Sequence, residues 1–168
     1  ERSTRPSCIA QVLGVLPPFR SLTTNAGDTW RLVRPIIAAE MPAAAMAGLT
    51  LSGEDGTPKT GVFTDDEAPE IDKAQYGSGR WPCLDSWRQG RVVRLDDLSS
   101  AVDRYPEFVK VAGSHGVRST LSLPLVAGDD RLGAINMYSR EVGGFTEEDE
   151  PTGVVLPATS AIVVPPAR

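Results

Sequence analysis

The residues with the greatest chemical potential lie in the segment Gly79-Arg-Trp-Pro-Cys-Leu-Asp-Ser-Trp87. A thiol beside Arg80 and a helix N-terminus can be activated as a nucleophile or a redox group. Cysteine is also among the most buried residue types, so Cys83 can instead fill space in a core. Trp81 and Trp87 allow the same two interpretations, core packing or contact with a ligand. The residue types alone favour packing, and a ligand-contact or redox role stays open.

Other residues that could do chemistry give weaker signals. His115 is the only histidine, and a lone histidine at the end of a predicted helix indicates a surface or capping role rather than metal or haem ligation. The acidic runs at 65–67, 96–97 and 147–150 do not have the spacing of a calcium loop and are typical of solvated turns and helix caps. The hydrolase, zinc and nucleotide-hydrolysis motifs are absent from the sequence. We therefore predict no catalytic residue and no metal site, and the cofactor is unknown.

Length and charge restrict the class of protein. The 168 residues fit one domain, and the net charge of −5 opposes direct binding to nucleic acid. The two cysteines, Cys8 and Cys83, are too few for a disulfide scaffold, which favours a reduced, cytoplasmic setting. No apolar run approaches the ~20 residues that cross a membrane. These features predict a soluble cytoplasmic domain whose partners are neither nucleic acid nor membrane.

Hydrophobic periodicity predicts the elements that would position these side chains. Two β-hairpins are expected at 46–64 and 119–139, each around a turn that contains Gly and Asp. The alternation of Leu121, Leu123 and Leu125 places one strand face against a core. Further predicted elements are a helix at 29–40, a central strand at 92–95 and a helix at 105–115. Because strands and helices do not alternate regularly, the pattern predicts an α+β fold.

Four stretches between Gly79 and Glu150 follow one another in a recognisable succession. They are Pro-Cys-Leu-Asp-x-Trp, then Gly-Val-Arg-Ser-x-Leu-Ser-Leu-Pro-Leu-Val, then Leu-Gly-Ala-Ile-Asn-x-Tyr and Phe-Thr-Glu-Glu-Asp. This succession resembles a GAF domain, of the actinobacterial type often found beside ANTAR RNA-binding domains. The first hairpin and the helix at 29–40 extend the resemblance to 25–150. Residues 1–24 are then a helical or irregular lead-in, and 151–168 are a proline-bearing C-terminal helix or tail.

The resemblance implies a PAS-related architecture. A central antiparallel sheet of five or six strands would carry the terminal helices on one face. Loops and short helices around Trp81 and Phe108 would cover the other face and enclose a ligand pocket. The terminal helices often form the dimer interface in this family, but Pro17, Pro18 and Pro151 oppose continuous helices here.

Family subtypes can be compared with individual residues. Asn136 is followed by Met137, so the lysine of the cyclic-nucleotide members is missing. Cys83 precedes leucine as in bilin carriers, but their Asp-Ile-Pro signature is absent. Free methionine sulfoxide reductases exchange thiols between several cysteines, and Cys83 is the only cysteine in the matching region.

Our leading hypothesis is a non-catalytic sensory domain that binds an unidentified small molecule. It would act as a homodimer in signalling or transcription control, with an output domain as a further partner. The predicted ligand-binding residues, chosen because aromatic and apolar groups suit a small-molecule pocket, are Trp81, Cys83, Phe108, Leu121 and Tyr138. A ligand-free dimerisation scaffold and a Cys83-based free methionine sulfoxide reductase are the alternatives.

Overall fold

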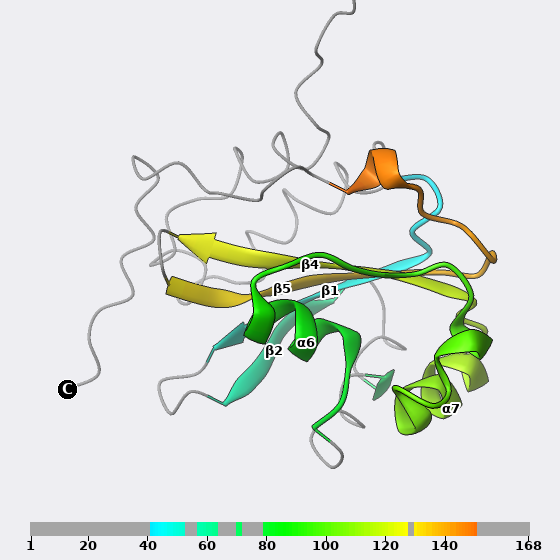
Figure 1. Ribbon diagram of the computed structural model, residues 1–168, viewed down its shortest axis with the longest axis horizontal. Helices are drawn as coiled ribbons and strands as arrows, with labels where there is room; N and C mark the ends of the chain where they lie inside the picture. The colour runs from blue at the N-terminus through cyan, green and yellow to red at the C-terminus, as the bar shows by residue number, and fades with distance from the viewer. Residues whose placement is uncertain (1–40, 53–56, 64–69, 72–78, 128–129, 151–168) are drawn as a thin grey trace, which may run out of the picture.

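The computed structural model describes residues 41–52, 57–63, 70–71, 79–127 and 130–150. Within them one antiparallel sheet has the strand order β2-β1-β5-β4-β3 (Figure 1). The strands are β1 (Met46–Ser52), β2 (Pro58–Phe63), β3 (Val93–Leu95), β4 (Ser119–Ala127) and β5 (Asp130–Ser139). Four of these strands have six residues or more, and β3 has three. The predicted α+β class with a central antiparallel sheet is confirmed.

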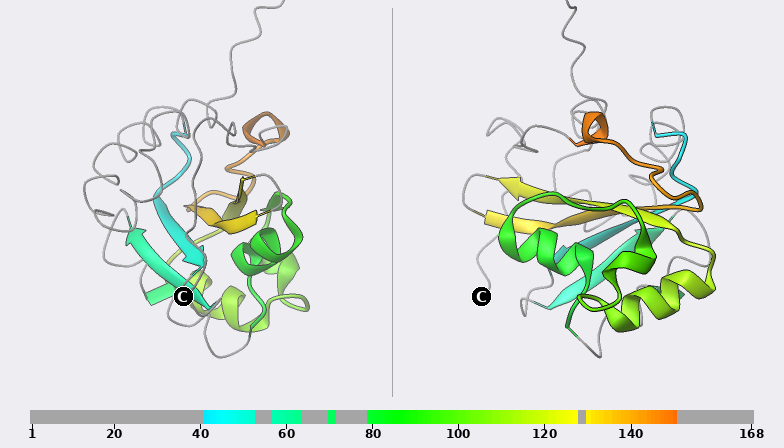
Figure 2. Two further views of the ribbon diagram at one scale, coloured as in Figure 1. Left: turned by 90° about the vertical axis from the view of Figure 1, so that its left-hand side faces the viewer. Right: turned by 45° about the vertical axis from the view of Figure 1, so that its right-hand side comes forward.

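Helices and short turns connect these strands. The helices are α6 (Pro82–Gln89) and α7 (Pro106–Ser114), and the 3-10 turns are η1 (Leu98–Ala101) and η2 (Glu147–Asp149). Figures 1 and 2 show α6 lying across the sheet and α7 beside it on the same side. Both predicted hairpins and the predicted helix at 105–115 are confirmed. The predicted helix at 29–40 and the terminal segments lie outside the described residues. None of the described helices is long and apolar enough to cross a membrane.

Two local predictions were wrong. The strand at 92–95 was expected at the centre of the sheet, but β3 lies at its edge and pairs only with β4. No helix was among the elements predicted at 82–89, but these residues form α6. Pro82 starts this helix because a proline at the first helical position loses no hydrogen bond. Gly90 ends it in the left-handed conformation, with φ of 63°.

Strand pairing assigns each sheet residue to one of two faces. Directly opposed residues share a face, so Met46, Tyr138 and Thr120 lie together. This face carries α6 and α7 and contains the core cluster that includes Trp81 and Phe108; we call it the covered face. The opposite face is more apolar and is also buried, with Leu121, Leu123, Ile135 and Met137 at 0–5% exposure.

Two serine hydroxyls fix the return of the chain after β5. Ser119 Oγ donates to the carbonyl of Glu141 at 2.6 Å and accepts from the amide of Gly144 at 3.1 Å. Ser139 Oγ accepts from the amide of Glu141 at 3.2 Å. Because both serines are fully buried, these bonds satisfy backbone groups that water cannot reach.

Gly144→Ala is expected to lower the free energy of unfolding by about 1–3 kcal/mol because the site has no room for a methyl group. A Cβ there would lie 2.7 Å from Ser139 Cβ and 3.0 Å from Ser119 Oγ. Urea unfolding measures the change. Gly113→Ala is the matched control, because Gly113 lies within α7 and a Cβ added there would meet open space. This substitution should raise the free energy of unfolding by up to about 1 kcal/mol. Equal effects of the two substitutions would contradict the packing around Gly144.

Candidate functional site

Aromatic side chains fill the space between the covered face and the two helices. Trp81 precedes α6, Phe108 lies in α7 and Tyr138 in β5, and each is at most 2% exposed. The ring centroids of Trp81 and Phe108 are 4.6 Å apart in an edge-to-face arrangement, and those of Phe108 and Tyr138 are 6.3 Å apart. Such pairs add about 0.5–1.5 kcal/mol beyond the area they bury. The aromatic rings therefore form a packed wall along the candidate site.

Four of the five predicted ligand-binding residues belong to this cluster. Trp81, Cys83, Phe108 and Tyr138 are brought together, whereas Leu121 lies on the opposite face of the sheet. The cause is an irregularity in the β4–β5 register between Leu125 and Val126. A register counted regularly from the turn would pair Leu121 with Asn136, on the face of Tyr138. The irregularity pairs Leu121 with Met137 instead, and so turns it away from the aromatic cluster.

A row of polar side chains that the sequence analysis missed lies on the covered face. Its members are buried to 0–2% exposure and come from three strands and α6: Thr50, Ser86, Thr120, Ser122 and Asn136. Ser86 Oγ donates to the carbonyl of Ser122 at 3.3 Å, which fastens α6 to β4. Asn136 Nδ2 donates to Thr50 Oγ1 at 3.2 Å, between residues 86 positions apart. The sequence did contain a signal for this row, because threonine, serine and asparagine alternate with apolar residues along β4 and β5.

Two oxygens in this polar row have no hydrogen-bond partner among the described residues. They are Thr120 Oγ1 and Asn136 Oδ1. Thr120 is opposite Tyr138 and Asn136 is opposite Ser122, so the two side chains are diagonal neighbours on β4 and β5. Diagonal neighbours on one face are about 7–8 Å apart, close enough for one small molecule to reach both. A buried polar group left without a partner costs about 1–3 kcal/mol, which makes these atoms a candidate binding site.

A carboxylate on α6 fastens the segment that leads into α7. Asp85 Oδ2 accepts from the Tyr105 hydroxyl at 2.7 Å and from Arg104 Nη2 at 3.1 Å. The Arg104 guanidinium also lies 4.9 Å from the centre of the Tyr105 ring. Burial of Tyr105, and then its hydrogen bond to the Asp85 carboxylate, raise the pKa of the phenol far above its usual range. Asp85 and Tyr105 thus join the two elements that enclose the aromatic cluster.

The remaining chemistry-bearing residues occupy structural positions. Cys83 is 3% exposed within α6 and packs in the aromatic core. His115 is the C-cap residue of α7, and its Nε2 lies 3.5 Å from Glu70 Oε2. The predicted position of His115 at the end of a helix is confirmed. In the part of the chain that the structure describes, histidine, cysteine and carboxylate side chains form no group suited to a metal ion.

An antiparallel sheet with short helices on one buried face defines an α+β domain. The GAF domain family model matches residues 23–154, and the chain belongs to the GAF domain family. GAF domains are typical of sensory signalling proteins. None of the curated proteins matches this sequence.

Solved structures share the fold at low sequence identity. A domain of a two-component sensor histidine kinase protein from Sinorhizobium meliloti is 14% identical, with a TM-score of 0.58 over 80% of this chain and 81% of the other. The GAF domain of a two-component sensor histidine kinase from Bacillus halodurans is 12% identical, with a TM-score of 0.50 over 77% and 82%. A type II free methionine-R-sulfoxide reductase from Thermoplasma acidophilum is 16% identical, with a TM-score of 0.57 over 76% and 84%. Regulatory domains and enzymes therefore share this fold.

Proposed function

We propose that this GAF domain is a non-catalytic sensor that binds a small polar molecule on the covered face. In this proposal the domain pairs with a copy of itself and passes the bound state to an output domain in signalling or transcription control. The observation that carries the proposal is the pair of buried oxygens, Thr120 Oγ1 and Asn136 Oδ1, without partners among the described residues. Buried polar groups are nearly always paired, so these atoms call for a ligand or an ordered water.

The geometry indicates the chemistry of the ligand. Asn136 uses its amide nitrogen on Thr50, which leaves Oδ1 as an acceptor. The Thr120 hydroxyl can donate or accept. A matching molecule therefore carries at least one N–H or O–H group, and an apolar part that contacts Tyr138 and the neighbouring rings. Small-molecule sites usually combine apolar walls with a few convergent polar groups in this way.

The surroundings of Cys83 support a binding role over catalysis. Its thiol is part of a packed core and only 3% exposed, whereas thiol exchange requires access to the substrate. Cys8, the other cysteine, lies outside the residues that match the family model. The reductase alternative is tested with free methionine sulfoxide: reduction that disappears in Cys83→Ser would favour the enzyme and contradict the proposal.

A ligand-free scaffold is the second candidate function. The close packing of Trp81 on Phe108 favours it, because side chains of the protein already occupy this part of the covered face. Native mass spectrometry of the purified chain separates the two functions. A co-purifying small molecule supports the sensor. Its absence, together with no thermal shift from nucleobases, amino acids and nucleotides, supports the scaffold.

Thr120→Val is expected to leave the free energy of unfolding unchanged or raise it by up to about 1 kcal/mol. The substitution removes a buried hydroxyl that has no described partner while nearly preserving its shape. Binding of any compound that shifts the melting temperature should weaken roughly tenfold, the effect of about 1.4 kcal/mol. Calorimetric titration and urea unfolding measure the two quantities.

Thr50→Val is the matched control for this experiment. Thr50 is buried to the same 1% on the same face, but its hydroxyl accepts the Asn136 hydrogen bond. Its substitution is expected to lower the free energy of unfolding by about 1–3 kcal/mol. If Thr120→Val destabilises the chain as much as Thr50→Val does, the Thr120 hydroxyl is already satisfied and the proposed site loses its main support.

A further inference from the structure

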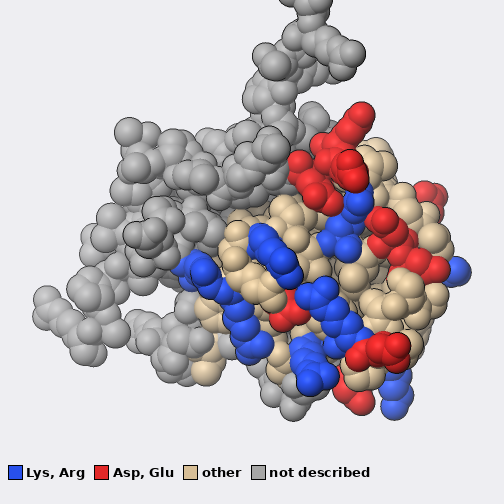
Figure 3. Space-filling view, in the orientation of Figure 1, with Lys and Arg blue, Asp and Glu red and all other residues tan. Residues whose placement is uncertain are grey.

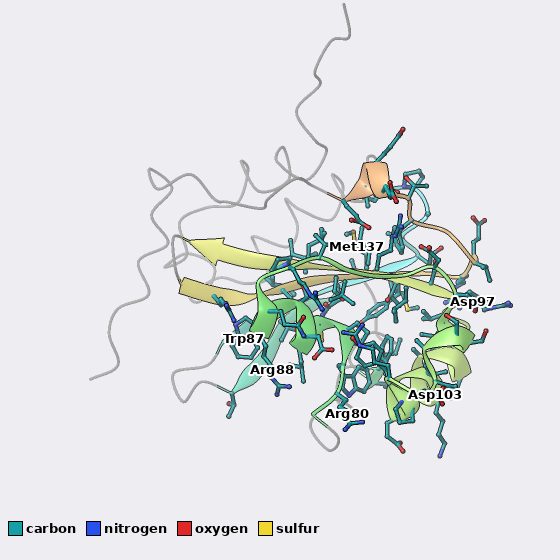
Figure 4. The ribbon with its side chains drawn as sticks, in the orientation of Figure 1. Arg80, Trp87, Arg88, Asp97, Asp103 and Met137 are labelled. Atoms are coloured by element: carbon teal, nitrogen blue, oxygen red, sulfur yellow. The ribbon has the colours of Figure 1, made fainter. Side chains whose placement is uncertain are left out.

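The outer surface of α6 carries a concentration of positive charge. Four exposed arginines surround the helix, and we call them the arginine face: Arg80, Arg88, Arg91 and Arg131. Arg131 reaches the end of α6, because a Cβ on Gly90 would lie 3.5 Å from its Nε. Figure 3 shows basic side chains gathered over the position of α6, and Figure 4 shows Arg88 on α6 and Arg80 on the segment that leads into it.

These guanidinium groups form no ion pair with the residues that the structure describes. Arg88 Nη1 donates to the carbonyl of Gly79 at 2.8 Å, and this acceptor carries no formal charge. Within the described residues no carboxylate forms a salt bridge with any of the four arginines. Like charges held close together repel one another, and an anionic partner relieves that repulsion. Arginine is also enriched in protein interfaces, where lysine is depleted.

A complementary negative surface lies on the same side of the molecule. Glu147 and Glu148 of η2 are exposed, and we call them the acidic corner. Their neighbours are engaged within the chain: Asp149 Oδ2 accepts from the amide of Thr146, and Glu150 lies 3.1 Å from Arg94 Nε. The carboxylates of Glu147 and Glu148 form no ion pair with a described residue. Figure 3 shows acidic side chains in the upper right part of the view, where Figure 1 has η2, apart from the basic group over α6.

We propose that the partner of the arginine face is the acidic corner of a second copy of this chain. Two copies that meet on this side about a two-fold axis place each acidic corner on the other copy's arginine face. A second copy accounts for both unpaired surfaces at once, whereas an unrelated acidic partner accounts for only one. The inference rests on the self-pairing in the proposed function and does not depend on the ligand.

The proposed contact is weak and sensitive to salt. Exposed ion pairs each contribute about 0.2–1 kcal/mol, and screening at physiological ionic strength acts beyond about 8 Å. Sedimentation velocity of the full chain should show a dimer at about 20 mM salt and dissociation at about 500 mM. A chain that stays monomeric at low salt, across the concentrations studied, overturns the proposal.

Reciprocal charge reversal tests which surfaces meet. Arg80 and Arg91 are exposed and form no side-chain hydrogen bond or ion pair with a described residue, so Arg80→Glu with Arg91→Glu should fold normally and weaken self-association at least tenfold. Glu147→Arg with Glu148→Arg should weaken it similarly. An equimolar mixture of the two double variants should form a heterodimer. One of its two contacts has the wild-type residues on both sides, and in the other the substituted positions of the two surfaces carry opposite charges.

A matched control distinguishes the effect of changing the arginine face from the effect of changing the net charge of the chain. Lys110→Glu with Arg118→Glu makes the same change in charge at exposed positions outside the arginine face, and should leave the dimer intact. Equal weakening in this control, or no heterodimer in the mixture, overturns the pairing. Thermal unfolding verifies that each variant is folded. Ligand-induced shifts in the monomeric variants test the sensor separately, because none of these residues belongs to the polar row.

Discussion

Replacing Trp81 with alanine is expected to lower the free energy of unfolding by about 3–5 kcal/mol. The side chain is fully buried and packs edge-to-face on Phe108, so its removal leaves a cavity lined by rigid rings. For a domain of this size the melting temperature should fall by about 6–20 °C. Thermal and urea unfolding measure the effect.

Trp87→Ala is the matched control for the tryptophan in the core. Trp87 is only partly buried at the other end of α6, and its indole N–H donates to the carbonyl of Arg131 at 2.9 Å. We expect a smaller loss, about 1–2 kcal/mol. If the two substitutions cost the same, the aromatic cluster is not the centre of the core.

The bond between Tyr105 and Asp85 predicts a loss of stability in alkaline solution. The folded state raises the pKa of Tyr105 above the unfolded value of about 10, so it favours the neutral phenol. Its contribution is fully present below about pH 10 and is lost as the pH rises further, because the unfolded chain releases the proton first. Above about pH 10, the free energy of unfolding of the wild type should fall with pH more steeply than that of Tyr105→Phe. The difference between the two slopes should be about 1.4 kcal/mol per pH unit.

Substitutions at Asp85 distinguish the two causes of this raised pKa. Asp85→Ala removes the acceptor of the buried phenol and should cost about 1.5–3 kcal/mol at neutral pH, whereas Asp85→Asn retains an acceptor and should cost less. Tyrosinate absorbance should show that Tyr105 ionises at a lower pH in Asp85→Ala than in the wild type. Its pKa should still lie above that of an ordinary phenol, because burial is the larger cause of the raised pKa. An ordinary phenol titration in the folded wild type would contradict the buried geometry.

The local sequence predicted the fold better than it predicted the site. Both hairpins, and the helix around Phe108, follow from short-range periodicity and turn residues. The helix at Cys83 was missed because eight residues between Pro82 and Gly90 offer little periodicity. The misplaced Leu121 depends on a single irregularity near Val126, which local alternation does not reveal.

The polar row could not be found from one stretch of sequence. Thr50 and Asn136 meet only because β1 and β5 are neighbours in the sheet, although hairpin pairing joins each of them to another strand. Within its own strand each residue resembles a solvent-facing position of an amphipathic sheet. Their burial depends on tertiary packing rather than on the local pattern: α6 is fastened to β4 through Ser86 and Ser122, and Ser122 is opposite Asn136.

The unpartnered oxygens of Thr120 and Asn136 also bear on the lifetime of the protein in a cell. A molecule that binds only the folded chain, at one hundred times its dissociation constant, adds about 2.7 kcal/mol to stability. Changes of about 1–2 kcal/mol alter cellular abundance several-fold, because proteases remove the unfolded fraction. An empty sensor would be degraded sooner than an occupied one, so the amount of protein would itself register the supply of its ligand.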